Sequence, residues 1–149
     1  METLRWVRLP ERELNAFLGD GGTGVISFAA GSTDPPYSVP VSYGYDVDSG
    51  DFHFRLALPP NSTKADLLDR PVSFVTYGQR DEGWRSVVAT GELDDLSEQP
   101  YDSTAVQERW NVTIPLIDIF EEPPENLTFR EFRLVPDELT GRKEVSSGD

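Results

Sequence analysis

Alternation between apolar and polar positions dominates the pattern of this chain. Six segments carry it, or form short apolar runs bounded by turn residues, and both patterns are typical of β-strands. They are GVISFAA, YSVPVSYGY, FHFRLAL, PVSFVTYG, WRSVVATGEL and LTFREFRLVP. The stretch DVDSGD between the second and third segments predicts a β-hairpin, and QRDEG predicts another tight connection. We therefore expect about six strands.

Three other segments favour short helices. The first, ERELNAFLGDGG, follows Pro10 and places Leu14 and Phe17 on one face before glycines end it. KADLLD has the composition of one or two helical turns, with Ser62 or Thr63 as the N-cap. STAVQERW is compatible with a third helix, whereas the proline inside NVTIPLIDIF leaves that apolar run ambiguous.

Many strands with few short helices predict a mainly β (α+β) fold, in which the sheet closes into a β-barrel with helical additions. The 149 residues and 37% hydrophobic content suit one domain with a real core. We expect a single domain over residues 1–149, with a polar tail at about 143–149 that is partly disordered. A closed sheet has no exposed edge. We expect ligand sites at the strand ends and on the outer face, where the helices leave room.

The net charge of the chain limits the classes of partner that it can bind. The chain has 27 acidic against 13 basic residues, for a net charge of -14, so nucleic acid and anionic membranes would be repelled. Only Lys64 and Lys143 are lysines; the other basic residues are arginines. An acidic, lysine-poor surface is typical of proteins that work in high salt, and we expect a halophilic, archaeal source. No run approaches the ~20 apolar residues of a membrane span, which predicts a cytoplasmic protein.

Few residue types remain for chemistry. The chain has no cysteine, so disulfides, zinc–thiolate sites and cysteine nucleophiles are excluded. His53 is the one histidine, and no metal site is expected. It alternates with Phe52 and Phe54, so it should face the opposite side, at the surface or as a satisfied polar group. The acidic pair Asp94-Asp95 is expected to be solvated.

The sequence NSTK, residues 61–64, gathers groups that suit a phosphate. It combines two hydroxyls, a cation and a predicted helix start, where backbone N–H groups are free to bind an anion. Arg55 lies on the preceding strand and is close enough in sequence to approach the same point. The alternative is that Ser62 or Thr63 only caps a helix and Lys64 is solvated.

A wider pattern bears on this choice. The succession PPYSVPVSYGYDVDSGDFHFRLAL, a lysine opening a short helix, RPVSFVTYG and GWRSVVATGEL resembles the pyridoxamine 5'-phosphate oxidase-like flavin-binding proteins of the split β-barrel fold. The resemblance runs roughly from Leu9 to Gly141 and is strongest between Tyr37 and Leu93. It implies a homodimer that binds FMN at the subunit interface and acts on a small molecule.

The resemblance also implies roles for particular residues. The isoalloxazine ring would lie against the second strand, the phosphate would be held after the third, and a later strand would complete the pocket. The ring would lie against Pro40, Val41, Ser42 and Tyr43, and the phosphate would be held by Arg55, Ser62, Thr63 and Lys64. The residues that would complete the pocket are Trp84, Ser86 and Val87. A purely structural alternative is that Val41, Val87 and Val88 belong to the core and that Trp84 covers its end.

Two departures from the family pattern affect the expected reaction. Many relatives have a histidine where Arg55 stands, but a guanidinium keeps the positive charge and can grip a phosphate bidentately. The loop ALPPNST is longer than usual and lacks glycine. Because the arginines and histidine that hold pyridoxamine phosphate cannot be placed, our first hypothesis is an FMN-dependent oxidoreductase of another substrate. The alternatives are an F420-dependent reductase of the same fold and a non-catalytic flavin- or haem-binding module.

Overall fold

The computed structural model describes residues 4–31, 33–58, 69–80, 83–96, 103–110, 112, 114 and 128–146. Within them it contains two helices and nine strands. The helices are α1 (Glu11–Leu18) and α2 (Thr104–Trp110). The strands are β1 (Leu4–Arg8), β2 (Gly22–Phe28), β3 (Tyr37–Asp46), β4 (Asp51–Leu58), β5 (Val72–Arg80), β6 (Gly83–Gly91), β7 (Leu93–Asp95), β8 (Thr128–Leu134) and β9 (Glu138–Ser146).

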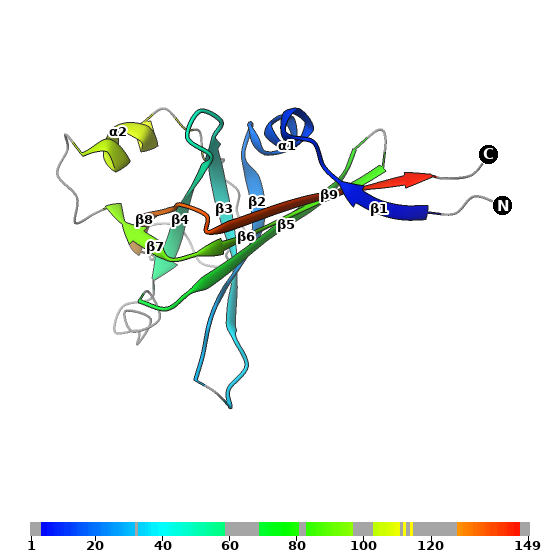
Figure 1. Cartoon of the computed structure of the whole chain (residues 1–149). Helices are drawn as coiled ribbons and strands as arrows, with labels where there is room; N and C mark the ends of the chain where they lie inside the picture. Colours follow the sequence, from blue (N-terminus) through cyan, green and yellow to red (C-terminus); the bar gives the residue numbers. More distant parts are fainter. Residues whose placement is uncertain are drawn as a thin grey trace.

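The strands form one curled antiparallel sheet in the order β1-β9-β6-β5-β2-β3-β4-β8-β7 (Figure 1). Only Glu92 separates β6 from β7, so one bent strand pairs with β5 in its first part and with β8 in its last. The bend needs Gly91, because a Cβ there would lie 3.0 Å from both the Leu134 side chain and the Val135 carbonyl oxygen. The sheet is therefore a partly closed, split barrel, as predicted.

The inner face of the barrel is filled by alternate residues of these strands. An aromatic group lies at its centre, with ring centroids 5.2 Å apart for Tyr43–Phe74 and 4.8 Å apart for Phe54–Phe74. Val41 and Val87 are fully buried in this core, as the structural alternative predicted. The same prediction is wrong for Val88, which is 37% exposed because strand alternation turns it to the outer face.

Helix α1 covers one end of the barrel (Figure 1). Its Phe17 and Leu18 are buried in the core, and Leu14 packs against it. Glu13 anchors the polar side of the helix, because its carboxylate lies 2.9 Å from the Lys143 ammonium on β9 and 4.0 Å from the Arg85 guanidinium on β6. The helix predicted after Pro10 is confirmed, with Pro10 as its N-cap.

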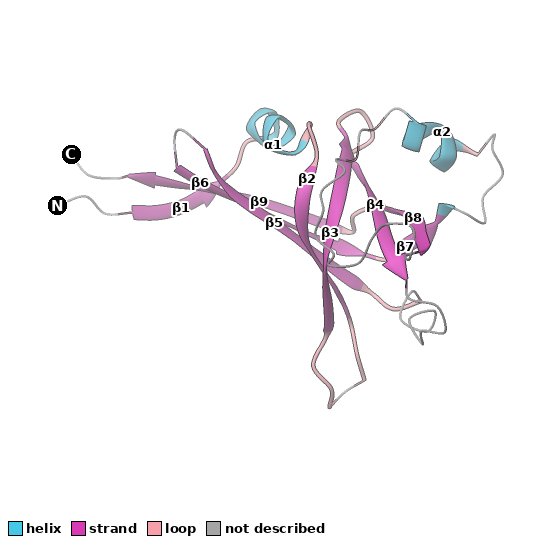
Figure 2. Ribbon diagram, turned by 180° about the vertical axis from the view of Figure 1, so that it is seen from behind, coloured by secondary structure: helices cyan, strands magenta, loops and turns pink. Residues whose placement is uncertain are grey.

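The number of strands exceeds the six predicted. Those six correspond to β2, β3, β4, β5, β6 and β8, which surround the core, whereas β1, β7 and β9 were missed. Of the polar tail predicted at about 143–149 and expected to be partly disordered, residues 143–146 complete β9 and pair with β1 (Figure 2). These strands carry charged side chains on both faces, so the apolar alternation that marks a core strand is absent from them.

Other predictions from the pattern have mixed outcomes. STAVQERW does form a helix, α2, whose first turn is capped by the Ser103 hydroxyl accepting from the Val106 N–H at 3.2 Å. The predicted helix at KADLLD lies outside the described residues, as does most of NVTIPLIDIF. Neither helix in the described part of the chain has the length and apolar character that crossing a bilayer requires.

Candidate functional site

A row of small apolar side chains crosses the outer face of the sheet. Strand register places Pro40 (β3) beside Val25 (β2), then Val75 (β5), Val88 (β6) and Thr140 (β9). Neighbouring strands lie ~4.8 Å apart, so the four apolar residues of this row, from Pro40 to Val88, span about 14 Å. Val25 is 39% exposed and Pro40 is exposed. The apolar strip, defined by the first four residues, is therefore an open surface for a flat apolar group.

Proline is tolerated inside β3 because of the way the sheet is built. Pairing between β3 and β4 begins only at Ser42, so within the described part of the chain residues 37–41 of β3 pair with β2 alone. Pro40 thus lies on a locally free edge, where its missing N–H leaves no ladder bond unmade. In Figure 1 this part of the β2–β3 pair extends beyond the rest of the sheet.

Hydroxyl groups border the apolar strip on both sides. On one side, Ser42 is in register with Thr23 of β2 and with Arg55 of β4. On the other side, the hydroxyls of Ser27 and Ser38 are hydrogen-bonded at 2.7 Å. A ring on the strip would therefore meet apolar groups beneath it and hydrogen-bonding groups at its edges, with a guanidinium near one corner.

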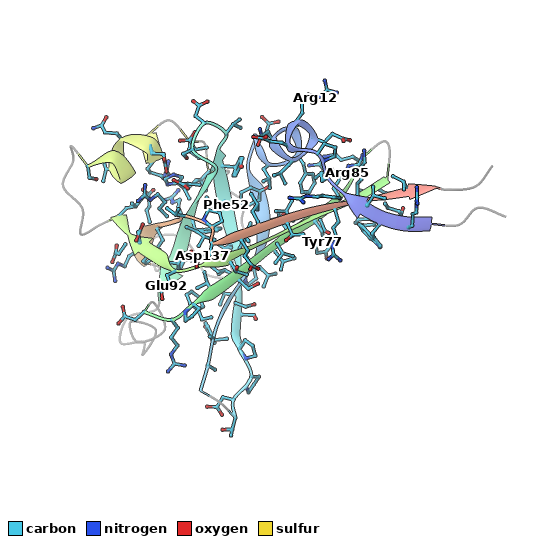
Figure 3. All side chains as sticks on the ribbon, viewed as in Figure 1. Arg12, Phe52, Tyr77, Arg85, Glu92 and Asp137 are labelled. Atoms are coloured by element: carbon cyan, nitrogen blue, oxygen red, sulfur yellow. The ribbon has the colours of Figure 1, made fainter. Side chains whose placement is uncertain are left out.

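The β6 end of this face carries aromatic side chains. The rings of Tyr77 (β5) and Trp84 (β6) lie 6.1 Å apart, and Tyr77 is 69% exposed. Ser86 is in register with Tyr77. Figure 3 shows Tyr77 and Arg85 on opposite sides of the sheet, in agreement with the burial of Arg85. Tyr77 was not among the predicted site residues, because its relation to Trp84 depends on strand pairing.

The predicted site residues that face outward divide between two places on the outer face. Pro40, Ser42 and Arg55 lie together on β3 and β4, whereas Trp84 and Ser86 lie on β6. Strands β2 and β5 separate β3 from β6, a distance of about 14 Å across three strand spacings. Val25 and Val75 fill this interval, which could not be predicted from the sequence because it follows only from the order of strands in the sheet.

Three predicted site residues point the other way. Val41, Tyr43 and Val87 are buried in the core, so their side chains face away from the apolar strip. Any contact they make with a group on the outer face must come from their backbone. The predicted phosphate ligands Ser62, Thr63 and Lys64 lie outside the described residues.

A buried polar cluster lies beside Arg55 on the outer face of β4. His53 is fully buried there, opposite its Phe neighbours as predicted, and its Nε2 lies 2.9 Å from the Glu108 carboxylate of α2. Burial, with help from the Arg109 charge, lowers the pKa of His53 to about 4. The ring is therefore neutral at pH 7, so its Nε2–H donates to Glu108. The Nε2 contact ties α2 to the sheet. The buried Nδ1 has no hydrogen-bond partner among the described residues, so His53 is only partly the satisfied polar group that was predicted.

Acidic and basic groups alternate around this histidine. Burial, followed by the neighbouring Glu108 carboxyl, raises the pKa of Asp51 to about 6. The Arg133 guanidinium lies 3.8 Å from each of these two carboxylates and 3.2 Å from Asp94. Asp95 forms an ion pair with Arg130. The prediction that Asp94 and Asp95 are simply solvated is therefore wrong, because β7 lies beside the arginines of β8.

Two surface depressions lie near α1 and the β1–β9 ribbon. One, of about 620 Å³, is bounded by α1 and the β3–β4 turn, and the other, of about 460 Å³, lies against β1 and β9. Neither is lined by a residue of the apolar strip. The strip itself is open, since Val25 and Val88 are 39% and 37% exposed.

Solved structures share this architecture. A Corynebacterium glutamicum protein that carries the provisional name pyridoxamine 5'-phosphate oxidase is 21% identical, with 97% of this chain and 96% of that chain covered and a TM-score of 0.64. The FAD-binding protein of Mycobacterium smegmatis is 16% identical, with coverages of 93% and 98% and a TM-score of 0.64. A FAD-binding protein of Mesorhizobium loti is 18% identical, with coverages of 97% and 98% and a TM-score of 0.60.

Sequence comparison is consistent with these structures. No curated protein matches the chain. The model of the family described as pyridoxamine 5'-phosphate oxidase, however, matches residues 10–143, which include both helices and β2 to β8. The resemblance seen in the sequence is confirmed, and the chain belongs to the pyridoxamine 5'-phosphate oxidase family.

Proposed function

We propose that this protein is a homodimeric flavoprotein that binds FMN on the outer face of its sheet and catalyses oxidation or reduction of a small molecule. The observation that carries the proposal is the apolar strip beside Ser42 and Arg55. Family membership and the names of two similar structures, both FAD-binding proteins, support a flavin in general. Identity to those structures is below one fifth, so the exact cofactor and substrate rest on the experiments below.

The residues present fit a flavin. Pro40 and Val25 would offer a flat apolar surface to the ring, bordered by the hydroxyls of Thr23 and of Ser42, which is only 9% exposed. Arg55 would supply positive charge on the same face, on the strand that precedes Lys64 in the sequence. When bound, the flavin supplies the electron-transfer chemistry, while these residues bind and orient it.

A second subunit would complete the site. The apolar strip is open, and a flavin lying on it would keep one face in water unless another surface covered it. A two-fold partner presenting the same outer face would cover both rings at once, since a symmetric interface uses each patch twice. Sedimentation at micromolar concentration in molar salt should give a dimer mass. A monomer that still binds flavin stoichiometrically would contradict the shared site.

The cofactor can be identified directly. The purified protein should be yellow, and mass spectrometry of the extracted chromophore would distinguish FMN from FAD, F420 and haem. Reduced nicotinamide should then bleach the flavin absorbance if the protein turns over. A protein that neither retains a flavin nor binds added FMN would overturn the proposed function, whereas binding without reduction by any donor would leave a flavin-storage or sensing role.

Substitution of Lys64 tests the phosphate contact. If Lys64 and Arg55 neutralise the phosphate, Lys64→Ala should weaken FMN binding by roughly ten- to a hundredfold, since a charge-assisted contact contributes about 1.5 to 3 kcal/mol. Riboflavin lacks the phosphate, so its affinity should hardly change. Titrations of both ligands into flavin-free protein at one fixed salt concentration measure the difference.

Lys143→Ala is the matched control, because it removes the other lysine, which is paired with Glu13 at 2.9 Å, away from the strip. It should leave FMN affinity nearly unchanged. Equal losses of FMN and riboflavin in Lys64→Ala would indicate structural damage, and no loss of FMN would mean that Lys64 is solvated.

A further inference from the structure

Two arginines face each other on the ribbon formed by β1 and β9. Arg8 of β1 is in register with Arg142 of β9, and both side chains are exposed. Arg142 is also in register with Ser86 of β6, so the pair lies on the same outer face as the apolar strip. Directly opposed side chains on antiparallel strands have Cβ atoms about 5 Å apart, and like charges in that arrangement repel.

The chain has many acidic groups, but none of those described neutralises Arg8 or Arg142. Acidic residues outnumber basic ones by 27 to 13, and on the inner face of the same ribbon Lys143 is bound to Glu13. Among the described residues, in contrast, neither Arg8 nor Arg142 forms an ion pair. Glu144, two positions along β9 from Arg142, pairs with neither arginine in this structure. The two positive charges are thus close together and available to an anion.

A depression accompanies the two guanidinium groups. Its volume is about 460 Å³, and Arg8, Arg142 and Trp6 all contribute to its lining. Trp6 is 52% exposed, so an apolar ring lies open beside the charges. Each guanidinium presents a fork of N–H donors that can bind phosphate oxygens bidentately, and an exposed indole can pack against a ring attached to the phosphate.

We propose that Arg8, Arg142 and Trp6 form a binding site for a phosphate or pyrophosphate group. The group would belong either to the cofactor, as an extension beyond the flavin ring, or to a second ligand that carries its own phosphate. Both sources share one chemistry: an anion relieves the repulsion between the arginines by neutralising them. Anion binding does not depend on the proposed flavin, although the choice between the two sources does.

Inorganic pyrophosphate is the first probe, titrated calorimetrically into flavin-free protein at low, fixed salt. Because the net charge of -14 repels anions elsewhere, measurable binding would be local. Arg142→Glu should weaken it by about a hundredfold or more, since one donor is replaced by a repelling carboxylate. Arg5→Ala is the control: Arg5 lies on β1, as Arg8 does, but at a position of opposite alternation, and its loss should change pyrophosphate affinity by no more than about twofold.

The thermal stability of Arg142→Glu distinguishes loss of the binding site from loss of the fold. It places a carboxylate opposite Arg8, which replaces repulsion with attraction, so the thermal midpoint should rise or stay equal. Loss of pyrophosphate binding at undiminished stability supports the site. Loss of binding together with a lowered midpoint, or unchanged binding in Arg142→Glu, would overturn it.

Binding experiments with flavins and with flavin-loaded protein identify the molecule that carries the phosphate. If Arg142→Glu lowers affinity for FAD but not for FMN, the arginines hold the pyrophosphate of a cofactor; if pyrophosphate still binds to flavin-loaded protein, they hold a second ligand. Either result supports the site. A wild-type protein that binds no pyrophosphate, but whose dimer dissociates in Arg142→Glu, would instead make this face a subunit contact and overturn the proposal. Failure of flavin binding alone would leave the pyrophosphate result standing.

Discussion

At the scale of single residues, Asp51 has the most unusual environment. It is buried beside the Glu108 carboxyl and the His53 ring, with Arg133 3.8 Å away as a partial counter-charge. Its pKa is raised from 3.8 to about 6, so the folded protein holds this proton more tightly than the unfolded chain does. Asp51 therefore contributes stability that is fully present below pH 3.8 and is lost as the pH rises through about 6.

His53 has the opposite linkage. Its pKa is lowered from 6.5 to about 4, so its contribution is present above pH 6.5 and is lost as the pH falls toward 4. Between these limits the two effects partly cancel in the wild type. A substitution at Asp51 removes the contribution of that residue, so comparison with the wild type shows in which direction Asp51 changes the stability as the pH rises.

We predict that Asp51→Asn stabilises the protein at pH 8, by on the order of 1 kcal/mol after allowance for partial solvent screening, because the amide removes a poorly neutralised buried charge. The gain should shrink toward zero near pH 4, where Asp51 is protonated in the wild type. Urea unfolding at pH 4, 6 and 8 measures the free-energy difference. Asp48→Asn, in the exposed β3–β4 turn, is the control for removal of a carboxylate at the surface. A gain in Asp51→Asn that is constant with pH would contradict the raised pKa of Asp51.

At the scale of elements, the attachment of α1 shows how a polar contact supplements an apolar one. Leu14, Phe17 and Leu18 pack into the end of the barrel, and Glu13 on the same helix meets cations from two strands that are neighbours in the sheet. The Arg85 side chain is only 7% exposed. Without Glu13, two positive groups would remain close together at the edge of the core.

Glu13→Ala should accordingly destabilise the protein by about 1 to 3 kcal/mol, because it leaves a buried guanidinium without this carboxylate. Glu11→Ala is the matched control: it removes a carboxylate from the same first turn, at an exposed position, and should cost only a few tenths of a kcal/mol of interaction with the helix dipole. Denaturant midpoints of the two variants can be compared directly. Similar losses in both would mean that the ion pairs with Glu13 add nothing beyond helix electrostatics.

For the molecule as a whole, charge is the dominant feature. A net charge of -14 on 149 residues opposes the compact state, even though the described part contains local ion pairs such as Arg109–Glu131 at 2.9 Å. Screening weakens long-range repulsion more than it weakens such close, partly buried pairs. The composition is also the basis for proposing a high-salt setting.

We expect the free energy of unfolding to rise when KCl is increased from about 0.1 to 1 M, because the screening length falls from about 10 to 3 Å. Chemical denaturation with urea, which leaves ionic strength unchanged, provides the measurement at each salt concentration. Sucrose is the control for surface exclusion that does not involve charge. A loss of stability with KCl would show that attractive pairs, and not net repulsion, control this protein's response to salt.

The sequence by itself determined the elements whose side chains meet the core. Phe52 and Phe54 alternate with polar residues, as do the other barrel strands, because a strand with one face buried must repeat every two residues. Leu14 and Phe17 marked α1 in the same way. The charged ribbon strands β1 and β9 were not predicted, because apolar and polar residues do not alternate along them. Lys143 and its neighbours are held in place by pairing with other strands.

Only the tertiary structure decided which residues share a surface. Pro40, Val25, Val75 and Val88 come from four strands, and their alignment depends on strand order and register, which local periodicity does not encode. The same holds for Arg8 and Arg142, which are far apart in the chain, and for His53, whose burial requires α2 to pack over it. Local pattern specifies which face a side chain takes, whereas long-range pairing specifies what lies beside it.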